Sequence, residues 1–277
     1  MIRTEKVIRY IVSWLKKYIQ KSKSNGFIIG ISGGVDSSVT SFLVAMTKFP
    51  TIILEMPILE KEKNLLPIKH AKFLKKNFSN VHYLEKDLSA LFKTFCHTTN
   101  DIQKNSKLSL ALANVKSRIR MLTLYYYANI KNYLVVGTGN KVEDFGVGFF
   151  TKYGDGGVDL HPIADLTKSE VRFLAKKLNI LDEIQKAKPT DGLWEDQRSD
   201  EDQLGATYEE LEWAMKIMKT KNYTFSEIEY QILKKYKMLH QKNRHKMIPI
   251  PICKIPDSIK ILSSYEEEKI FNNKSYS

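Results

Sequence analysis

Four short apolar runs, which alternate with segments of helical periodicity, constrain the fold of this 277-residue chain more than any other feature. The runs read as buried strands at residues 27–31, 51–54, 81–84 and 133–136. Apolar side chains recur at helical spacing in residues 6–20, 39–46, 68–78, 88–95 and 109–129. Strands that alternate with helices predict an α/β fold, a doubly wound parallel sheet of Rossmann-like type.

The second half of the chain has a different character. Residues 145–159 are rich in glycine, and this stretch is long for an inert connector. Beyond it, three capping boxes beginning at Thr167, Thr207 and Ser226 precede apolar-periodic segments, which predicts a helical C-terminal part. We find no internal repeat and no obvious linker, so we expect one domain.

Composition excludes several classes of protein. No apolar run approaches the ~20 residues of a membrane span, and the N-terminus lacks a signal peptide's pattern, so we expect a cytoplasmic protein with no membrane partner. Cys96 and Cys253 form no CxxC pair, which argues against a disulfide scaffold or a structural zinc site. The net charge of +13 permits RNA binding, but the lysines are spread along the chain, which favours solvated faces and no nucleic-acid partner.

The loop from Gly30 to Ser38 lies between the first strand and its helix. Small residues there allow close backbone approach to a phosphate, and a helix N-terminus offers free N–H groups. Asp36 would repel a phosphate unless a cation lay between them, so we interpret it as a Mg²⁺ ligand. The alternative is a glycine turn in which the aspartate caps the helix.

A second polar segment, Gly137 to Asp144, directly follows the fourth strand. Glu143 could reach the same ion as Asp36, because two carboxylates with phosphate oxygens and water suit the octahedron of Mg²⁺. Asp144 is the alternative second ligand, and a solvated acidic turn is the alternative to a metal site.

These motifs carry a resemblance to a known family. Residues 32–37 resemble the SGGxDS loop of the ATP pyrophosphatases, whose fold is of the adenine nucleotide alpha hydrolase type. GTxNKxE at 137–143 and GFFTKYGDGGxD at 148–159 are similar to the signature of the ammonia-dependent NAD synthetases. Further matching blocks extend the resemblance from about Gly30 to Pro251.

The resemblance implies a single NAD synthetase domain over residues 1–277, a homodimer, and a carbon–nitrogen ligase reaction. Mg-ATP would adenylate the carboxylate of deamido-NAD, and ammonia would displace AMP. The chain has no recognisable amidotransferase cysteine and its ATP loop begins at Gly30, so we expect it to use free ammonia rather than glutamine. The alternative is that a separate subunit supplies the ammonia. The N-terminal helix and the region of Tyr125 are candidates for the dimer interface.

The resemblance also assigns residues. The implied ATP-binding residues are Gly30, Ile31, Ser32, Gly33, Gly34, Val35, Asp36, Ser37, Thr138, Lys168 and Thr190. Those implied for deamido-NAD are Arg118, Lys152, Asp159, His245 and Lys246. Asp36 and Glu143 would hold Mg²⁺, and Asp36, Lys168 and Asp155 would act in catalysis.

Two other functions compete with this interpretation. A tRNA-modifying adenylase would use the same loop, although it would leave residues 148–159 unexplained. A non-catalytic nucleotide-binding module would bind ATP without releasing pyrophosphate.

Overall fold

The computed structural model describes residues 2–59, 64–100, 105–194, 196, 198–218, 220 and 224–260. The chain divides into two compact units, Met1–Met247 and Ile248–Ser277. The first unit holds the sheet, and the second contributes one short described helix, α11 (Asp257–Lys260). The predicted single domain over residues 1–277 extends over the segment 261–277, which lies outside the described residues.

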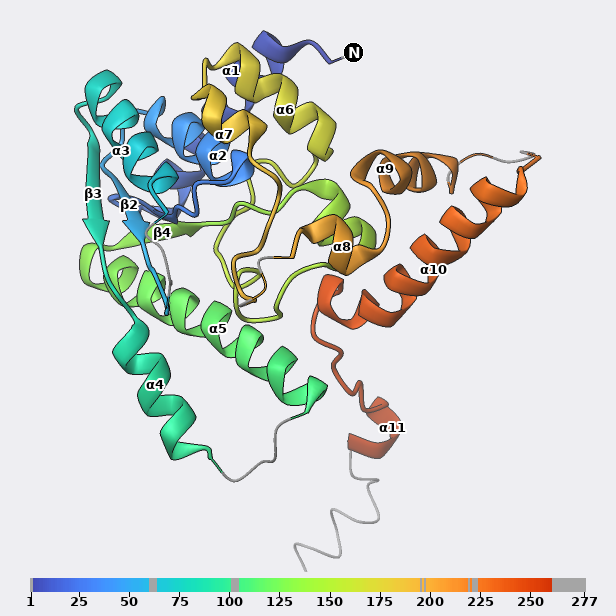
Figure 1. Ribbon diagram of the computed structural model, residues 1–277. Coiled ribbons are helices and arrows are strands. Elements are labelled where there is room, and N and C mark those ends of the chain that lie inside the picture. Colours follow the sequence, from blue (N-terminus) through green and yellow to red (C-terminus); the bar gives the residue numbers. More distant parts are fainter. Residues whose placement is uncertain are drawn as a thin grey trace, which may run out of the picture. The chain divides into compact units, whose positions relative to one another are not determined.

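A four-stranded parallel sheet forms the centre of the first unit (Figure 1). Its strands are β1 (Gly26–Gly30), β2 (Thr51–Glu55), β3 (Val81–Glu85) and β4 (Tyr133–Val136), in the order β3-β2-β1-β4. Ile28 of β1 lies in register with Ile52 on one side and Val135 on the other. The predicted doubly wound parallel sheet is confirmed.

Helices cover both faces of this sheet (Figure 1). One face packs on α1 (Thr4–Ser22), α2 (Val35–Ala45), α3 (Leu66–Asn77), α6 (Lys168–Lys177) and α7 (Asp182–Lys186). The other face packs on α4 (Ser89–Thr98) and α5 (Ser106–Lys131). Successive residues of β1 alternate between these layers, since Phe27 and Ile29 face the first and Ile28 faces the second.

A third apolar cluster holds the helical part that follows the sheet. It joins η1 (Val142–Val147), a π-helix, to α9 (Tyr208–Ile217) and α10 (Glu227–Met247), with Leu204 of α8 (Asp200–Leu204) also buried in it. The capping boxes predicted at Thr167, Thr207 and Ser226 are present. A fourth, at Ser199, was not predicted because its third helical residue is aspartate instead of glutamate or glutamine.

The order of the strands decides where a ligand can bind. β1 has β2 on one side and β4 on the other, so the connections leaving β1 and β4 diverge at their carboxyl ends. Such a switch point is where doubly wound sheets bind ligands. The two polar segments singled out in the sequence, residues 30–38 and 137–144, both begin there.

No helix within the described ranges has the length and apolar character needed to cross a membrane.

Candidate active site

The loop after β1 is a compact turn held by its own side chains. Ser37 Oγ accepts a hydrogen bond from the Ser32 N–H at 3.3 Å, and Ser32 Oγ accepts one from the Gly34 N–H at 3.2 Å. Gly33 has a φ of +81°, and a Cβ there would lie 2.8 Å from Cβ of Leu66, so glycine is needed both for backbone conformation and for space. The loop thus delivers the N-terminus of α2 to the switch point.

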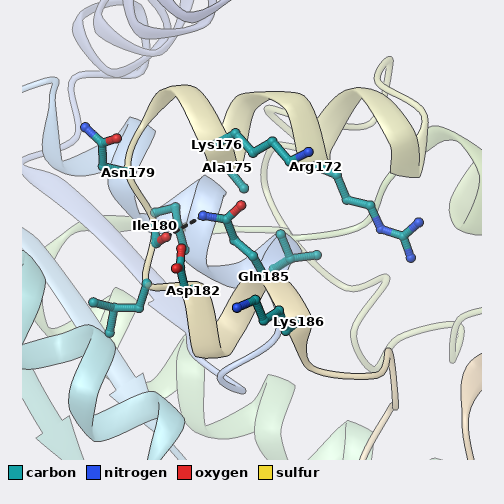
Figure 2. A pocket seen from close by; sticks show the side chains of 10 residues that line it. Arg172, Ala175, Lys176, Asn179, Ile180, Asp182, Gln185 and Lys186 are labelled. Atoms are coloured by element: carbon teal, nitrogen blue, oxygen red, sulfur yellow. Dashed lines mark hydrogen bonds between the residues drawn. The ribbon is translucent and has the colours of Figure 1, made fainter.

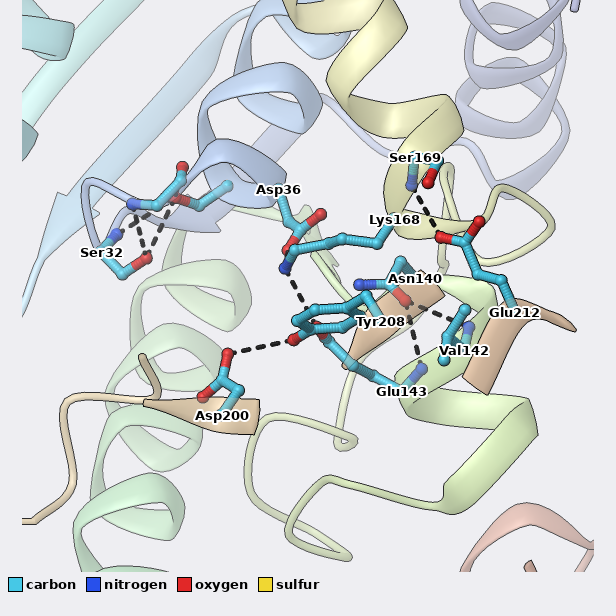
Figure 3. Close-up of polar contacts among 12 residues, drawn as sticks. Ser32, Asp36, Asn140, Val142, Glu143, Lys168, Ser169, Asp200, Tyr208 and Glu212 are labelled. Carbon is cyan, nitrogen blue, oxygen red and sulfur yellow. Dashed lines mark hydrogen bonds and ion pairs between the residues drawn. The ribbon is translucent and has the colours of Figure 1, made fainter. Parts of the chain in front are cut away.

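Two carboxylates from distant segments meet at one buried ammonium group (Figure 3). Lys168 Nζ lies 2.5 Å from Asp36 Oδ2 and 3.0 Å from Glu143 Oε1. Only 3% of Lys168 is exposed, although it stands at the start of a helix, where a free cation is unfavourable. Its position is explained by the two anions, which come from α2 and η1.

Burial and charge act against each other in this group. Burial raises the pKa of Asp36 to about 6, against the attraction of the Lys168 ammonium, and repulsion from Glu143 is part of this rise. Burial alone would lower the pKa of Lys168, but the Asp36 and Glu143 carboxylates outweigh it and hold that pKa above its usual value. Above pH 6, therefore, the charged Lys168 faces an ionised Asp36.

A tyrosine and a third acid complete the cluster (Figure 3). Tyr208, which is fully buried, donates its hydroxyl to Glu143 Oε1 at 2.5 Å, and its ring lies 4.7 Å from Lys168 Nζ. The same hydroxyl lies 3.1 Å from Asp200 Oδ2. Burial, followed by repulsion from Glu143, raises the pKa of Asp200 to about 7.

The structure separates the two adjacent candidates for the second metal ligand. Glu143 is the one that shares Lys168 with Asp36. Asp144 is buried on another side, where its Oδ2 lies 3.4 Å from His161 Nδ1. Asn140 fixes this arrangement, because its Oδ1 accepts hydrogen bonds from the N–H groups of residues 142 and 143 and so holds the start of η1.

The donor set suits Mg²⁺. Asp36 and Glu143 already converge on one cationic atom, the ammonium nitrogen of Lys168. Asp36 Oδ1 is buried and, among the described residues, has no hydrogen-bond partner. Hard carboxylate oxygens with substrate phosphates are the usual ligands of this ion, so these two residues would hold it. In the described part of the chain, no group of three His, Cys, Asp or Glu side chains is placed to bind a metal.

Four of the residues assigned to deamido-NAD meet where α5, the glycine-rich segment and the end of α10 come together. The Arg118 guanidinium donates to the carbonyl of Lys152 at 3.4 Å, and Lys152 Nζ donates to the carbonyl of His245 at 3.0 Å. Lys246 Nζ donates to the carbonyl of Phe150 at 2.8 Å. The three cationic side chains thus gather beside the segment after η1.

Asp155 and Asp159 have structural partners of their own. Asp155 Oδ1 accepts hydrogen bonds from Ser117 Oγ at 2.7 Å and from the Thr151 N–H at 2.9 Å. Asp159 is engaged through both oxygens, by the Val135 N–H at 2.7 Å and the Tyr125 hydroxyl at 3.0 Å. The Asp159 carboxylate therefore supports β4, while Asp155 shapes the glycine-rich segment.

The two threonines assigned to ATP lie in different settings. Thr138 is half-buried in the loop after β4, at the switch point. Thr190 is exposed and donates to the carbonyl of Arg198 at 3.2 Å, which closes the segment that leads to α8. The structure therefore brings Thr138 to the same end of the sheet as residues 30–37, and places Thr190 beside the chain that delivers Asp200.

Sequence reasoning missed three members of the cluster: Asn140, Asp200 and Tyr208. Asp200 and Tyr208 each stand at the first helical position after a capping residue, Ser199 or Thr207. Those caps predict that a helix begins, but they do not say what its first side chain touches. The burial of the Asp200 side chain is visible only in the structure, so the local sequence held no signal of its contacts.

A separate pocket of about 750 Å³ lies between α6 and α7 (Figure 2). Arg172, Lys176 and Lys186 line it, together with Val35 of the loop after β1. Val35 is the one predicted site residue among its lining residues. The pocket therefore touches the predicted site at Val35, and the other predicted site residues lie outside its lining.

A glycine- and serine-rich turn at the switch point, with two carboxylates and a lysine at its rim, defines a nucleotide-binding α/β protein. The family model for NAD synthase matches residues 7–249 of the chain. The chain belongs to the NAD synthase family.

Individual relatives agree with the family. The NH(3)-dependent NAD(+) synthetase of Saccharolobus solfataricus is 37% identical over 92% of this chain and 91% of its own length. That of Methanocaldococcus jannaschii is 38% identical over 77% of this chain and 81% of its own. The structure of NMN synthetase from Francisella tularensis superposes with a TM-score of 0.81 at 28% identity, covering 92% of this chain and 100% of that one.

Replacing Lys168 with Met should destabilise the protein by about 3–5 kcal/mol, because Asp36 and Glu143 would face each other without their shared cation. Adding Asp36→Asn should restore part of the loss. Urea unfolding at pH 8, where Asp36 is ionised, measures both effects. Lys69→Met is the matched control, since Lys69 pairs with Glu183 at the surface and its loss should cost about 1 kcal/mol or less. A double variant no more stable than Lys168→Met would contradict this account.

Asp200 should make stability fall as the pH rises. Its folded-state pKa of about 7 exceeds the ordinary aspartate pKa of 3.8, so between these pH values the folded state retains a proton that the unfolded state has lost. Asp200→Asn removes that dependence. The stability of Asp200→Asn relative to wild type should therefore increase from pH 4 to pH 7, by up to a few kcal/mol (about 1.4 for each unit of pKa shift), and then level off. A melting-temperature difference that stays constant between pH 4 and 8 would contradict this.

Proposed function

We propose that the chain catalyses the ATP-dependent amidation of deamido-NAD to NAD with ammonia, releasing AMP and pyrophosphate. The single observation that carries this proposal is the convergence of Asp36, Glu143 and Lys168 at the rim of the loop after β1. Membership of the NAD synthase family and the names of the relatives support the choice of substrates.

The loop after β1 would bind the phosphates of ATP. Its serine hydroxyls and the N-terminus of α2 are the donors that phosphate oxygens need. Lys168 supplies a positive charge at the rim, and it is held there by two carboxylates. A lysine in this position offsets the negative charge that builds up on a departing pyrophosphate.

The reaction balances without a side-chain nucleophile. The nicotinate carboxylate attacks the α-phosphorus of ATP, and the bond from this phosphorus to the oxygen that bridges the α and β phosphates breaks. Pyrophosphate departs, and an acyl-adenylate is formed. Ammonia then attacks the activated carbonyl carbon, loses a proton, and AMP departs with the bonding electron pair. Binding both reactants in line at the switch point supplies much of the rate.

Asp36 and Glu143 would hold Mg²⁺ beside the phosphates. When bound, the ion neutralises charge on the phosphate oxygens. Hydrogen bonds within the protein hold the two carboxylates in orientation. Asp36 accepts one from Lys168, and Glu143 accepts one from Lys168 and one from Tyr208.

The dinucleotide would lie along the segment that follows η1. Arg118, Lys152 and Lys246 gather their charges there, with His245 beside them. Asp155 lies beside Ser117 and Thr151, on the helix and the glycine-rich segment that also carry Arg118 and Lys152. We infer that the nicotinate end and ammonia meet beside Asp155.

A second acceptor is favoured by one observation. The structure of NMN synthetase from Francisella tularensis matches this chain over 100% of its own length with a TM-score of 0.81. Nicotinate mononucleotide presents the same carboxylate as deamido-NAD but lacks the adenylate half. It would react by the same steps while using fewer of the cationic side chains.

We also propose a homodimer, located in the cytoplasm, with no nucleic-acid partner. The outer face of α5 supports the dimer, because Leu122, Tyr126 and Ile130 follow one another at four-residue spacing and are 60%, 61% and 59% exposed. An apolar stripe of this kind on one helix face marks an interaction surface.

A coupled assay with Mg-ATP, ammonium and either acceptor tests the function. With deamido-NAD, NAD and pyrophosphate should appear in equal amounts, and glutamine should not replace ammonium.

Glu143→Gln should lower kcat/KM by about 10²-fold or more, whereas Asp144→Asn should act far less, because Asp144 faces His161. Asp36→Ala with near-normal turnover would refute the metal role. Faster turnover of nicotinate mononucleotide would select the second acceptor. If neither NAD nor pyrophosphate forms, the result would favour a non-catalytic binding module.

Replacing Leu122 and Ile130 with Glu should convert the dimer to a monomer, because two charges would have to be buried at the contact. Light scattering after size-exclusion chromatography measures the mass. Ile228→Glu on α10 is the control, since Ile228 is 73% exposed and lies away from the stripe. A wild-type monomer, or a double variant that remains dimeric, would contradict the proposed interface.

A further inference from the structure

Among the described residues of the first unit, Tyr208 has the largest side chain that is fully buried, and this side chain ends in a polar atom. Its ring packs in the apolar cluster shared by η1, α9 and α10. A buried hydroxyl is costly unless it is hydrogen-bonded, and both partners of this one belong to the acidic cluster. Phenylalanine would fill the same apolar space, so packing alone does not explain the hydroxyl.

The hydroxyl has one proton for two acceptors. It lies 2.5 Å from Glu143 Oε1 and 3.1 Å from Asp200 Oδ2, so the shorter contact identifies Glu143 as the acceptor. Asp200 lies on the other side of the phenol oxygen and limits its movement. The proton is therefore directed at the carboxylate that faces Asp36.

Glu143 Oε1 accepts two hydrogen bonds, one from Tyr208 and one from Lys168. Both donors engage the same oxygen, Oε1, so neither of them occupies Oε2. The same tyrosine also places its ring 4.7 Å from Lys168 Nζ, where the ring face attracts the ammonium. One side chain thus orients both the acid and the cation of the site.

We propose that Tyr208 is a positioning residue: its hydroxyl holds Glu143 in the orientation in which Glu143 and Asp36 together bind a divalent cation. This inference rests on the proposed function only for the identity of the reaction. Partners that orient a metal ligand change metal affinity or activity by about 10–100-fold when they are removed.

Tyr208→Phe in the full-length chain separates the hydroxyl from the ring, because the ring beneath Lys168 is retained. Calorimetric titration with Mn²⁺, in the presence of α,β-methylene-ATP to prevent turnover, measures metal binding directly. We expect the Mn²⁺ dissociation constant to rise about 10-fold or more. In the assay, the Mg²⁺ concentration for half-maximal rate should rise similarly, while excess Mg²⁺ restores kcat and the KM for the acceptor stays unchanged.

Tyr236→Phe is the matched control. Tyr236 is also buried in the helical cluster, where its ring stacks on His240, and it lies outside the acidic group. Its Mn²⁺ affinity should equal that of wild type. Glu143→Gln supplies a second check: if Tyr208 acts through Glu143, then Tyr208→Phe should cause no further loss of Mn²⁺ affinity in that background.

The outcomes separate this proposal from the function. Wild-type Mn²⁺ affinity in Tyr208→Phe, an equal loss in Tyr236→Phe, or additive losses with Glu143→Gln would overturn the positioning role. Weaker Mn²⁺ binding in Tyr208→Phe with no amidation by wild type would support the positioning role and refute the function. If Tyr208→Phe does not fold, the double variant Asp200→Asn/Tyr208→Phe is measured instead, because it also removes the Asp200 carboxylate that would lose its partner. The single variant Asp200→Asn is then the reference.

Discussion

The site depends on one buried ammonium group that two carboxylates share. Lys168 lies between Asp36 and Glu143, and its ammonium offsets the repulsion between them. Removing such charges from water is costly, and the cost is recovered only when each is closely paired. The arrangement therefore couples the stability of the fold to the geometry that a nucleotide and its cation require.

The sheet makes this pairing possible by bringing distant segments to one edge. Asp36 follows β1, Glu143 follows β4, and Lys168 begins the helix α6 that packs against α2. Because β1 and β4 are neighbours, their carboxyl ends lie side by side although about a hundred residues separate them. The helical part then supplies Tyr208, whose ring belongs to the third apolar cluster. The group of Asp36, Glu143, Lys168 and Tyr208 therefore joins the sheet layer to that cluster.

Much of the fold could be predicted because local pattern and tertiary environment agree. Strands covered on both faces are largely apolar, as β1 is, and the four apolar runs predicted the bounds of β1 to β4 within one or two residues. The sequence analysis chose Glu143 as the second proposed metal ligand and kept the adjacent Asp144 as the alternative. The π-helix gives these two acids different surroundings, because it turns Glu143 toward Lys168 and Asp144 toward His161. Asn140, which holds the start of that helix, carries no signal of this role in the sequence.

The sequence by itself determined the α/β class, the phosphate loop with Asp36, the membership in a family, and the segments that bear the site residues. These follow from short-range pattern, since apolar periodicity and turn chemistry act between near neighbours. Only the tertiary structure decided that Lys168 is buried between two acids and that Tyr208 and Asp200 join them. Those contacts join residues far apart in the chain, and their free energy depends on the exclusion of water, which no local pattern encodes.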